Sequence, residues 1–290
     1  MASNLNKPSF STTLLAGKVA LVTGAGSQLG IGRSTCLALM AAGAAAVYAT
    51  DLNSGNFESL QKAAAAINSE CRVEGRVLDV TSEEETLKLI TEITREHGRF
   101  DLYFPNAGYV DVKNINDVTS VQIDDKPSSS GAIVVTASVG GMNGKYADMP
   151  YCTAKAAAIG MVRSACIQLS KSNIRINAIA PGFVATSLLS SSAYAQKGEK
   201  VSQAGTEEQA KADFFGYRKA QGMSEDYRYY FERVAMPEEM ANISVFLASD
   251  LASSINGQTI AADSGMTEGA LAHECLGGIP EVLPLEITLN

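Results

Sequence analysis

The sequence is poor in the residues that metal and nucleic-acid sites require. It holds two histidines, His97 and His273, and no tryptophan. This scarcity argues against a zinc site and against a catalytic triad built on histidine. Acidic residues outnumber basic ones by 31 to 23, which gives a net charge of −8. Because phosphate binding needs clustered Lys and Arg, nucleic acid is a poor candidate partner.

Disulfide patterns and long apolar runs are also lacking. The five cysteines are an odd number and none has C-x-x-C spacing, which favours free thiols in a reducing compartment. Residues 1–18 contain no apolar run of signal-peptide length, and the longest apolar stretches are too short for a membrane span. We therefore expect a soluble, cytoplasmic protein with no metal, no membrane and no nucleic-acid partner.

Short apolar runs alternate with helical patterns along most of the chain. The 290 residues, 46% of them apolar, are enough for one large α/β domain. Strands are predicted at 18–23, 45–50, 73–78, 100–104, 132–136, 174–180 and 257–262, with helices at 56–69, 83–97 and 237–249 among those that alternate with them. Such alternation indicates right-handed βαβ units and a doubly wound parallel sheet.

A glycine-rich stretch, Gly24 to Gly32, joins the first strand to a helical pattern. Glycines permit a tight turn and a close approach of the backbone to a pyrophosphate. The helix N-terminus then supplies N–H groups and the positive end of its dipole. A glycine cluster alone is often a plain turn, but its place between a strand and a helix predicts a dinucleotide site.

Asp51 ends the second predicted strand, 19 positions after Gly32. A carboxylate there accepts hydrogen bonds from the adenosine ribose hydroxyls and repels a 2′-phosphate, which favours NAD over NADP. The alternative is an aspartate that caps a helix or a turn. Arg33, directly after the glycine loop, leaves some tolerance for NADP.

Small and polar residues follow the other predicted strands as well. Asp79 follows the third strand, Asn106 to Gly108 the fourth, Ser138 the fifth, and Pro181 with Gly182 the sixth. In parallel sheets the ligand lies beyond the carboxyl ends of the strands. These residues are therefore expected to share one site with the glycine loop.

Ser138, Tyr151 and Lys155 form the candidate catalytic group. Tyr151 and Lys155 lie four apart in a helical pattern, so the phenol and the ammonium share one helix face. A neighbouring ammonium favours the phenolate and is expected to lower the pKa of the tyrosine. Together with the serine hydroxyl, this group is suited to moving a proton to or from an alcohol or a carbonyl.

In this order, the motifs resemble the short-chain dehydrogenase/reductase family from about residue 17 to residue 265. They are Thr23-Gly24 with Gly30-Ile31-Gly32, Asp79-Val80, Asn106-Ala107-Gly108, Ser138, Tyr151-Cys-Thr-Ala-Lys155, Pro181-Gly182, Thr186 and the closing strand. The resemblance implies a Rossmann-type, doubly wound parallel sheet in a single domain.

The resemblance also implies roles for the site residues. Tyr151 would be the acid/base, Ser138 would orient the substrate oxygen, and Lys155 would lower the Tyr151 pKa and hold the nicotinamide ribose. Asp51 would bind the adenosine ribose, Asp79 and Val80 the adenine, and Val184 and Thr186 the carboxamide end. The full cofactor set is Gly24, Ser27, Gly30, Ile31, Gly32, Asp51, Asp79, Val80, Asn106, Ala107, Gly108, Tyr151, Lys155, Pro181, Gly182, Val184 and Thr186.

The chain departs from the family pattern in two places. The glycine loop is two residues longer than the common form, with Ser27 to Leu29 before Gly30. Gly108 and Ser138 are only 30 positions apart, fewer than is usual. We therefore expect the helix between the fourth and fifth strands to be shortened or missing, through a real deletion or a mis-spliced transcript. With it would go the asparagine of the family's proton relay, and much of its usual homo-oligomer interface.

The domain organisation predicted is a flexible lead-in at 1–16, the dehydrogenase domain at 17–267 and a tail at 268–290. Residues 187–232 are polar with interspersed aromatics and are too long for an ordinary connection, which indicates a lid over the substrate. The alternative is a pair of surface helices packed through those aromatic side chains.

The function expected is hydride transfer between NAD(H) and a secondary alcohol or ketone. The substrate expected is a bulky hydrophobic small molecule, such as an intermediate of secondary metabolism. Two alternatives remain open: a nucleotide-binding but catalytically impaired relative that lacks the asparagine-bearing helix, and an NADPH-dependent ketone reductase.

Overall fold

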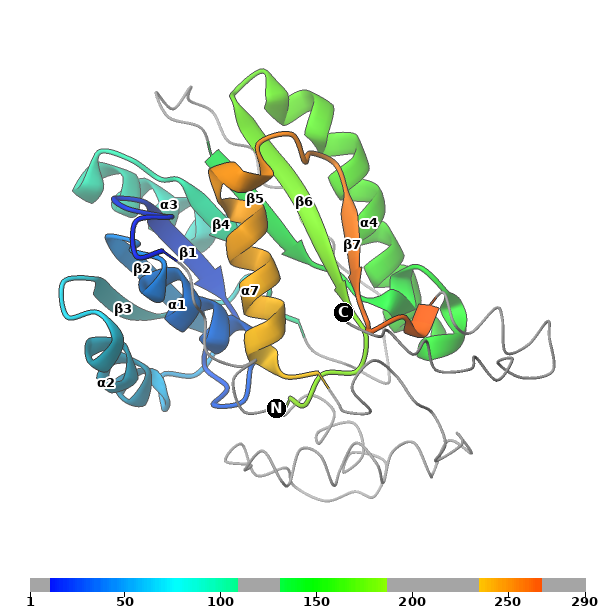
Figure 1. The fold of residues 1–290 in the computed structure, drawn as a ribbon, viewed down its shortest axis with the longest axis horizontal. Helices are drawn as coiled ribbons and strands as arrows, with labels where there is room; N and C mark the ends of the chain where they lie inside the picture. Colours follow the sequence, from blue (N-terminus) through cyan, green and yellow to red (C-terminus); the bar gives the residue numbers. More distant parts are fainter. Residues whose placement is uncertain (1–10, 109–130, 187–234, 268–290) are drawn as a thin grey trace, which may run out of the picture.

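Seven parallel strands in one sheet form the centre of the molecule (Figure 1). The computed structural model describes residues 11–108, 131–186 and 235–267. The strand order is β3-β2-β1-β4-β5-β6-β7. The chain therefore winds outward from β1 in one direction and then from β4 in the other, and the predicted doubly wound α/β fold is confirmed.

The elements lie within a few residues of the predicted bounds. The strands are β1 (Val19–Thr23), β2 (Ala46–Asp51), β3 (Arg72–Val77), β4 (Leu102–Phe104), β5 (Gly131–Thr136), β6 (Ile174–Pro181) and β7 (Thr259–Ala262). The helices are α1 (Ile31–Ala41), α2 (Phe57–Ile67), α3 (Glu83–His97), α4 (Met149–Ser170) and α7 (Pro237–Ala248), with short 3₁₀ turns η2 (Val139–Gly141), η3 (Gly144–Tyr146) and η5 (Asp250–Ala252).

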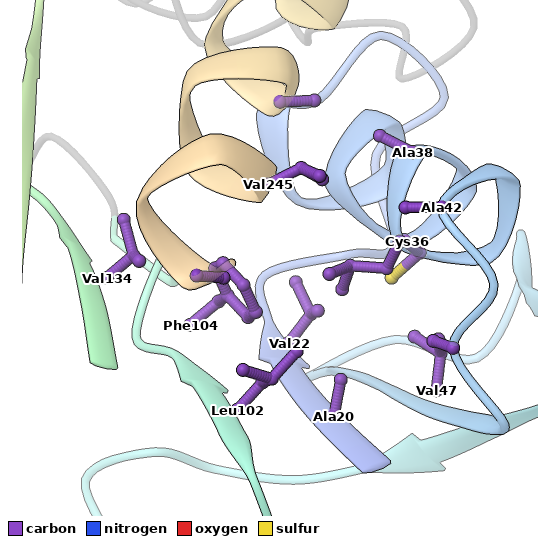
Figure 2. Close-up of a cluster of buried hydrophobic side chains, with 14 of the residues drawn as sticks. Ala20, Val22, Cys36, Ala38, Ala42, Val47, Leu102, Phe104, Val134 and Val245 are labelled. Atoms are coloured by element: carbon purple, nitrogen blue, oxygen red, sulfur yellow. The ribbon is translucent and has the colours of Figure 1, made fainter. Parts of the chain in front are cut away.

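Helices cover both faces of the sheet. Along β1, Ala20 and Val22 pack with side chains of α1, α2 and α7, whereas Val19 and Leu21 pack with side chains of α3. Figure 2 shows the first of these clusters, in which Phe104 and Val245 meet the side chains of α1. Because alternate side chains are buried on opposite faces, the strands read as continuous apolar runs in the sequence.

The strand register brings the carboxyl ends of the central strands to one edge of the sheet. Thr23 lies beside Thr50, Val22 beside Phe104, and Thr136 beside Ile179. Each of these strands runs in the same direction, so the loops that leave them emerge side by side. The residues that the sequence analysis assigns to the cofactor site follow the strands at this edge of the sheet.

Several predictions concern chain outside the described residues. The predicted loss of a helix between β4 and β5 falls mostly on 109–130, and the lid and the tail fall on 187–232 and 268–290. In the described part of the lead-in, residues 11–16, Leu15 is buried and its N–H donates to the Ala42 carbonyl at 2.8 Å. This short stretch therefore packs on the end of α1. None of the described helices is long and apolar enough to cross a membrane.

Candidate active site

Ser138 occupies a fixed place just beyond the end of β5. It is the N-cap of η2, and its Oγ accepts a hydrogen bond from the Gly140 N–H at 3.1 Å. Its side chain is buried. The hydroxyl is therefore held in one orientation by the turn that follows it.

The first turn of α4 places the other two catalytic candidates. The Asp148 carboxylate accepts a hydrogen bond from the Tyr151 N–H at 3.1 Å, and Pro150 lies in the first turn, where it needs no N–H partner. These two features start the helix just before Tyr151. Lys155 follows one turn later, with its ammonium 5.8 Å from the centroid of the Tyr151 ring. The predicted approach of these two side chains is present in the structure.

A close backbone contact brings the serine turn onto α4. A Cβ added at Gly141 would lie 2.5 Å from the carbonyl carbon of Lys155, so only glycine fits this contact. A Cβ added at the neighbouring Gly140 would lie 3.5 Å from Ser138 Oγ and 3.3 Å from Cε1 of the Tyr151 ring, so the serine hydroxyl and the tyrosine ring flank the same glycine. The structure thus joins all three predicted catalytic residues, from two separate elements, in one cluster.

Thr136, which the sequence pattern did not single out, connects this cluster to the glycine loop. Its carbonyl accepts a hydrogen bond from the Lys155 ammonium at 2.9 Å, and its hydroxyl donates to Asn106 Oδ1 at 3.1 Å. The Asn106 amide then donates to the carbonyls of Thr23 and Gly24 at 3.0 and 3.3 Å. A threonine at the end of a strand is ordinary β composition, so nothing in the sequence marked this role.

Burial controls the protonation of both titratable candidates. It lowers the pKa of Lys155 to about 8 and raises the pKa of Tyr151, while the hydrogen bond with Ser138 opposes the second shift without reversing it. The expectation that Lys155 lowers the Tyr151 pKa is therefore wrong for this structure. Removal from water is the largest cause of both pKa shifts, and the ammonium is engaged by the Thr136 carbonyl.

The N-terminus of α1 is suited to an anion. Gly30 is its N-cap and makes no side-chain cap, and its first turn, which contains Ile31 and Gly32, has no acidic residue. The first turn of α3, by contrast, carries Glu83, Glu84 and Glu85. Among the described residues, the N-cap and first turn of α1 thus supply no side chain that neutralises its N–H groups and dipole, which fits the pyrophosphate of a dinucleotide.

Asp51 lies against the glycine loop at the end of β2. Its Oδ2 accepts a hydrogen bond from the Gly26 N–H at 2.9 Å. The N-cap of α2 is Asn56, so Asp51 does not cap this helix, but its Oδ1 accepts a hydrogen bond from the Asn53 N–H at 3.4 Å, and the turn aspartate of the alternative is therefore present. The carboxylate stands at the edge where the fold of a dinucleotide-binding protein receives the adenosine ribose.

The other predicted cofactor residues lie along the same edge. Thr23 Oγ1 accepts hydrogen bonds from the N–H groups of Asn106 and Ala107, both at 3.0 Å. Asp79 Oδ1 accepts two hydrogen bonds from Thr81, which hold its pKa below the usual range. The remaining positions are in the loops after β1 (Gly24, Ser27), after β3 (Val80), after β4 (Gly108) and at the end of β6 or beyond it (Pro181, Gly182, Val184, Thr186).

Fold and site together define a dinucleotide-binding α/β protein with a Ser-Tyr-Lys group at the nucleotide edge. A family profile described as short chain dehydrogenase matches residues 18–127 and 125–197, and one described as Enoyl-(Acyl carrier protein) reductase matches residues 200–267. The chain belongs to the short-chain dehydrogenase/reductase family.

Named relatives agree with this placement. The chain is 31% identical to 3-oxoacyl-[acyl-carrier-protein] reductase FabG of Thermotoga maritima, over 87% of this chain and 98% of that protein. It is 29% identical to levodione reductase of Leifsonia aquatica, over 89% and 97%. The crystal structure of levodione reductase superposes with a TM-score of 0.67 at 27% identity, over 89% of this chain and 99% of that one. These relatives support an oxidoreductase that acts on a CH–OH group or a ketone.

Proposed function

We propose that this protein transfers a hydride between NAD(H) and a secondary alcohol or its ketone. The observation that carries the proposal is the group of Ser138, Tyr151 and Lys155, which hydrogen bonds through Thr136 and Asn106 connect to the glycine loop before α1. When bound, the nicotinamide supplies the hydride chemistry. The chain supplies the binding site, the orientation of the substrate and the proton.

Tyr151 is the proposed acid and base. With its pKa raised, the phenol is protonated near neutral pH and carries the proton that a carbonyl oxygen would receive. In the reverse direction the phenolate takes the proton of an alcohol. Ser138 lies on the same side of Gly140 as the Tyr151 ring, and we assign its hydroxyl to the same substrate oxygen. Lys155, held by the Thr136 carbonyl, supplies positive charge next to the developing phenolate.

The charge at the end of β2 supports NAD rather than NADP. The Asp51 carboxylate lies where a 2′-phosphate would meet a like charge. Arg33, which would favour a phosphate, donates a hydrogen bond to the Asn56 carbonyl at 3.3 Å. Its guanidinium is thus directed to the start of α2.

Two exposed methionines close in sequence to the catalytic group support a hydrophobic substrate. Met142 follows η2 and is 45% exposed, and Met149 begins α4 and is 73% exposed. Both are close in sequence to residues of the catalytic group. We propose a bulky apolar alcohol or ketone of secondary metabolism as the substrate. We further propose that the protein acts in the cytoplasm.

The test is NADH formation, followed by its absorbance, with a panel of hydrophobic secondary alcohols. Tyr151→Phe is expected to lower kcat by about 10²- to 10⁴-fold, the range that general acid–base catalysis contributes. Tyr103→Phe is the matched control, because Tyr103 packs with the apolar clusters under α3 and α4. Turnover by Tyr151→Phe equal to that of the control would remove Tyr151 from the mechanism.

One observation favours a second candidate, a nucleotide-binding protein with impaired catalysis. The family match is split into two segments that meet at residues 125–127, inside the connection that is short in the sequence. Calorimetric NAD binding without turnover of any alcohol or ketone would support this candidate. Comparing KM for NADH and NADPH in ketone reduction tests the third possibility, an NADPH-dependent reductase. Gel filtration tests whether the chain forms the homo-oligomer that is usual for its family.

A further inference from the structure

Asn56 stands at the start of α2 but does not cap it. Asparagine at an N-cap normally accepts a hydrogen bond from an N–H group of its own helix. In the described chain, the Asn56 side chain makes no such bond. Its Nδ2 instead donates to the Gly26 carbonyl at 2.7 Å, and its Oδ1 accepts from Gln28 Nε2 at 3.2 Å. The amide is directed away from its helix and toward the glycine loop.

The peptide groups of Gly26 are therefore held from both sides. Its N–H donates to Asp51, the last residue of β2, and its carbonyl accepts from Asn56, the N-cap of α2, so the two partners stand at the two ends of the connection between β2 and α2. A Cβ added at Gly26 would lie 2.7 Å from the Asp51 carboxyl carbon, so the loop touches this connection directly. The glycine loop is thus tied to the residue that we propose to bind the adenosine ribose.

Asn56 is itself fixed by its neighbours. Its carbonyl accepts hydrogen bonds from Arg33 Nη1 at 3.3 Å and from Ser59 Oγ at 2.9 Å. Asn56 thus contacts Gly26 before the additional loop residues Ser27 to Leu29, Gln28 among them and Arg33 after them. A long glycine-rich loop loses conformational freedom when it closes on a ligand, and fixing it beforehand reduces that cost.

We propose that Asn56 is a positioning residue for the dinucleotide, whose side-chain amide cross-links the glycine loop to the start of α2. The inference rests on the proposed function, because it assigns the loop to the cofactor. In this proposal Asn56 does not touch the reacting atoms. It acts on the affinity for the cofactor by fixing the glycine loop.

The experiment measures NAD binding by calorimetry for the wild type, Asn56→Ala and Asn56→Ser. Serine is a good N-cap but is too short to bridge Gly26 and Gln28, so this variant separates helix capping from loop positioning. Both variants are expected to bind NAD about tenfold more weakly, which corresponds to about 1.4 kcal/mol. KM for NAD should rise in parallel, while kcat at saturating NAD and KM for the alcohol stay within about twofold.

Two further variants sharpen the result. Gln28→Ala, which removes one of the two bonds, should weaken NAD binding by a smaller factor than Asn56→Ala. Ser59→Ala is the control, because Ser59 contacts the Asn56 carbonyl and not the loop. Its NAD affinity should equal that of the wild type.

The outcomes separate the inference from the function on which it rests. If the wild type binds no NAD and turns over no substrate with it, the proposed function fails. If the wild type binds NAD and Asn56→Ala binds it equally well, only the inference fails. It also fails if Asn56→Ser restores binding, since capping would then explain the effect, or if kcat falls while KM for NAD is unchanged.

Discussion

The Lys155 ammonium lies 5.8 Å from the centroid of the Tyr151 ring and donates its hydrogen bond to the main-chain carbonyl of Thr136. The two side chains are thus neighbours without forming a direct ion pair. Burial acts on each separately and disfavours the ammonium and the phenolate alike. In the proposed mechanism, proton transfer to a ketone starts from a protonated Tyr151 phenol beside a Lys155 ammonium whose pKa is lowered.

The pH dependence of the two reaction directions should be opposite. In the proposed mechanism, ketone reduction uses the Tyr151 phenol, which is present below its pKa, whereas alcohol oxidation uses the phenolate, which increases with pH. Because burial raises the Tyr151 pKa, oxidation should accelerate from pH 7 toward alkaline pH, while reduction should decline only there. Initial rates in both directions on one alcohol–ketone pair check this. Oxidation that slows as the pH rises from 7 to 9 would contradict it.

Lys155 should also make the stability of the fold depend on pH. Its pKa falls from 10.5 to about 8 on folding. Between these values the unfolded chain binds more protons than the folded one, so the free energy of unfolding contributed by this group rises with pH. The cost of burying the ammonium is fully present below pH 8 and is relieved toward pH 10.

Lys155→Met removes that cost and isolates the effect. Its stability relative to the wild type should be more favourable at pH 7 than at pH 10, by up to about 3 kcal/mol for a shift of this size. Urea denaturation at the two pH values measures it. Lys62→Met, at an exposed lysine of α2, should show no such dependence. Equal differences at both pH values would show that Lys155 titrates normally.

The alternation of short apolar runs with helical patterns along the sequence was sufficient to predict the doubly wound parallel sheet. The strand ends and the spacing of Tyr151 and Lys155 are local features, and the structure has them where they were predicted. Thr136 and Asn56 were not found, because their roles depend on hydrogen bonds between strands and loops distant in the sequence. The direction of the Tyr151 pKa shift was missed for a related reason: it depends on burial, which the Tyr-Lys spacing does not show.

Gly141 offers a test of how the serine turn is positioned. A Cβ there would overlap the carbonyl of Lys155, so Gly141→Ala must displace the turn or the helix. Such overpacking typically costs about 1–3 kcal/mol of stability. Because the turn carries Ser138, kcat should fall as well.

Gly160→Ala is the matched control for that variant. Gly160 lies on the same helix, and no described atom lies within 4 Å of the Cβ that alanine would add. Alanine at an open helical position should stabilise the protein by about 0.5–1 kcal/mol. Thermal unfolding and kcat of both variants are the measurements. Similar behaviour of the two would show that the contact between η2 and α4 is not tight.

Asp51→Asn tests whether this carboxylate causes the proposed preference for NAD over NADP. Asparagine keeps an oxygen that accepts the Gly26 N–H, so the loop retains this contact while the negative charge is lost. A charge pair at about 4 Å near a protein surface is worth about 1–4 kcal/mol, depending on the local dielectric. Removing the repulsion of a 2′-phosphate should therefore raise the ratio of kcat/KM for NADP to that for NAD by about tenfold or more. Asp250→Asn, in η5, changes the net charge equally and should leave the ratio unaltered. If the ratio does not move in Asp51→Asn, the preference arises from contacts other than this carboxylate, and the role of Asp51 is limited to holding the glycine loop.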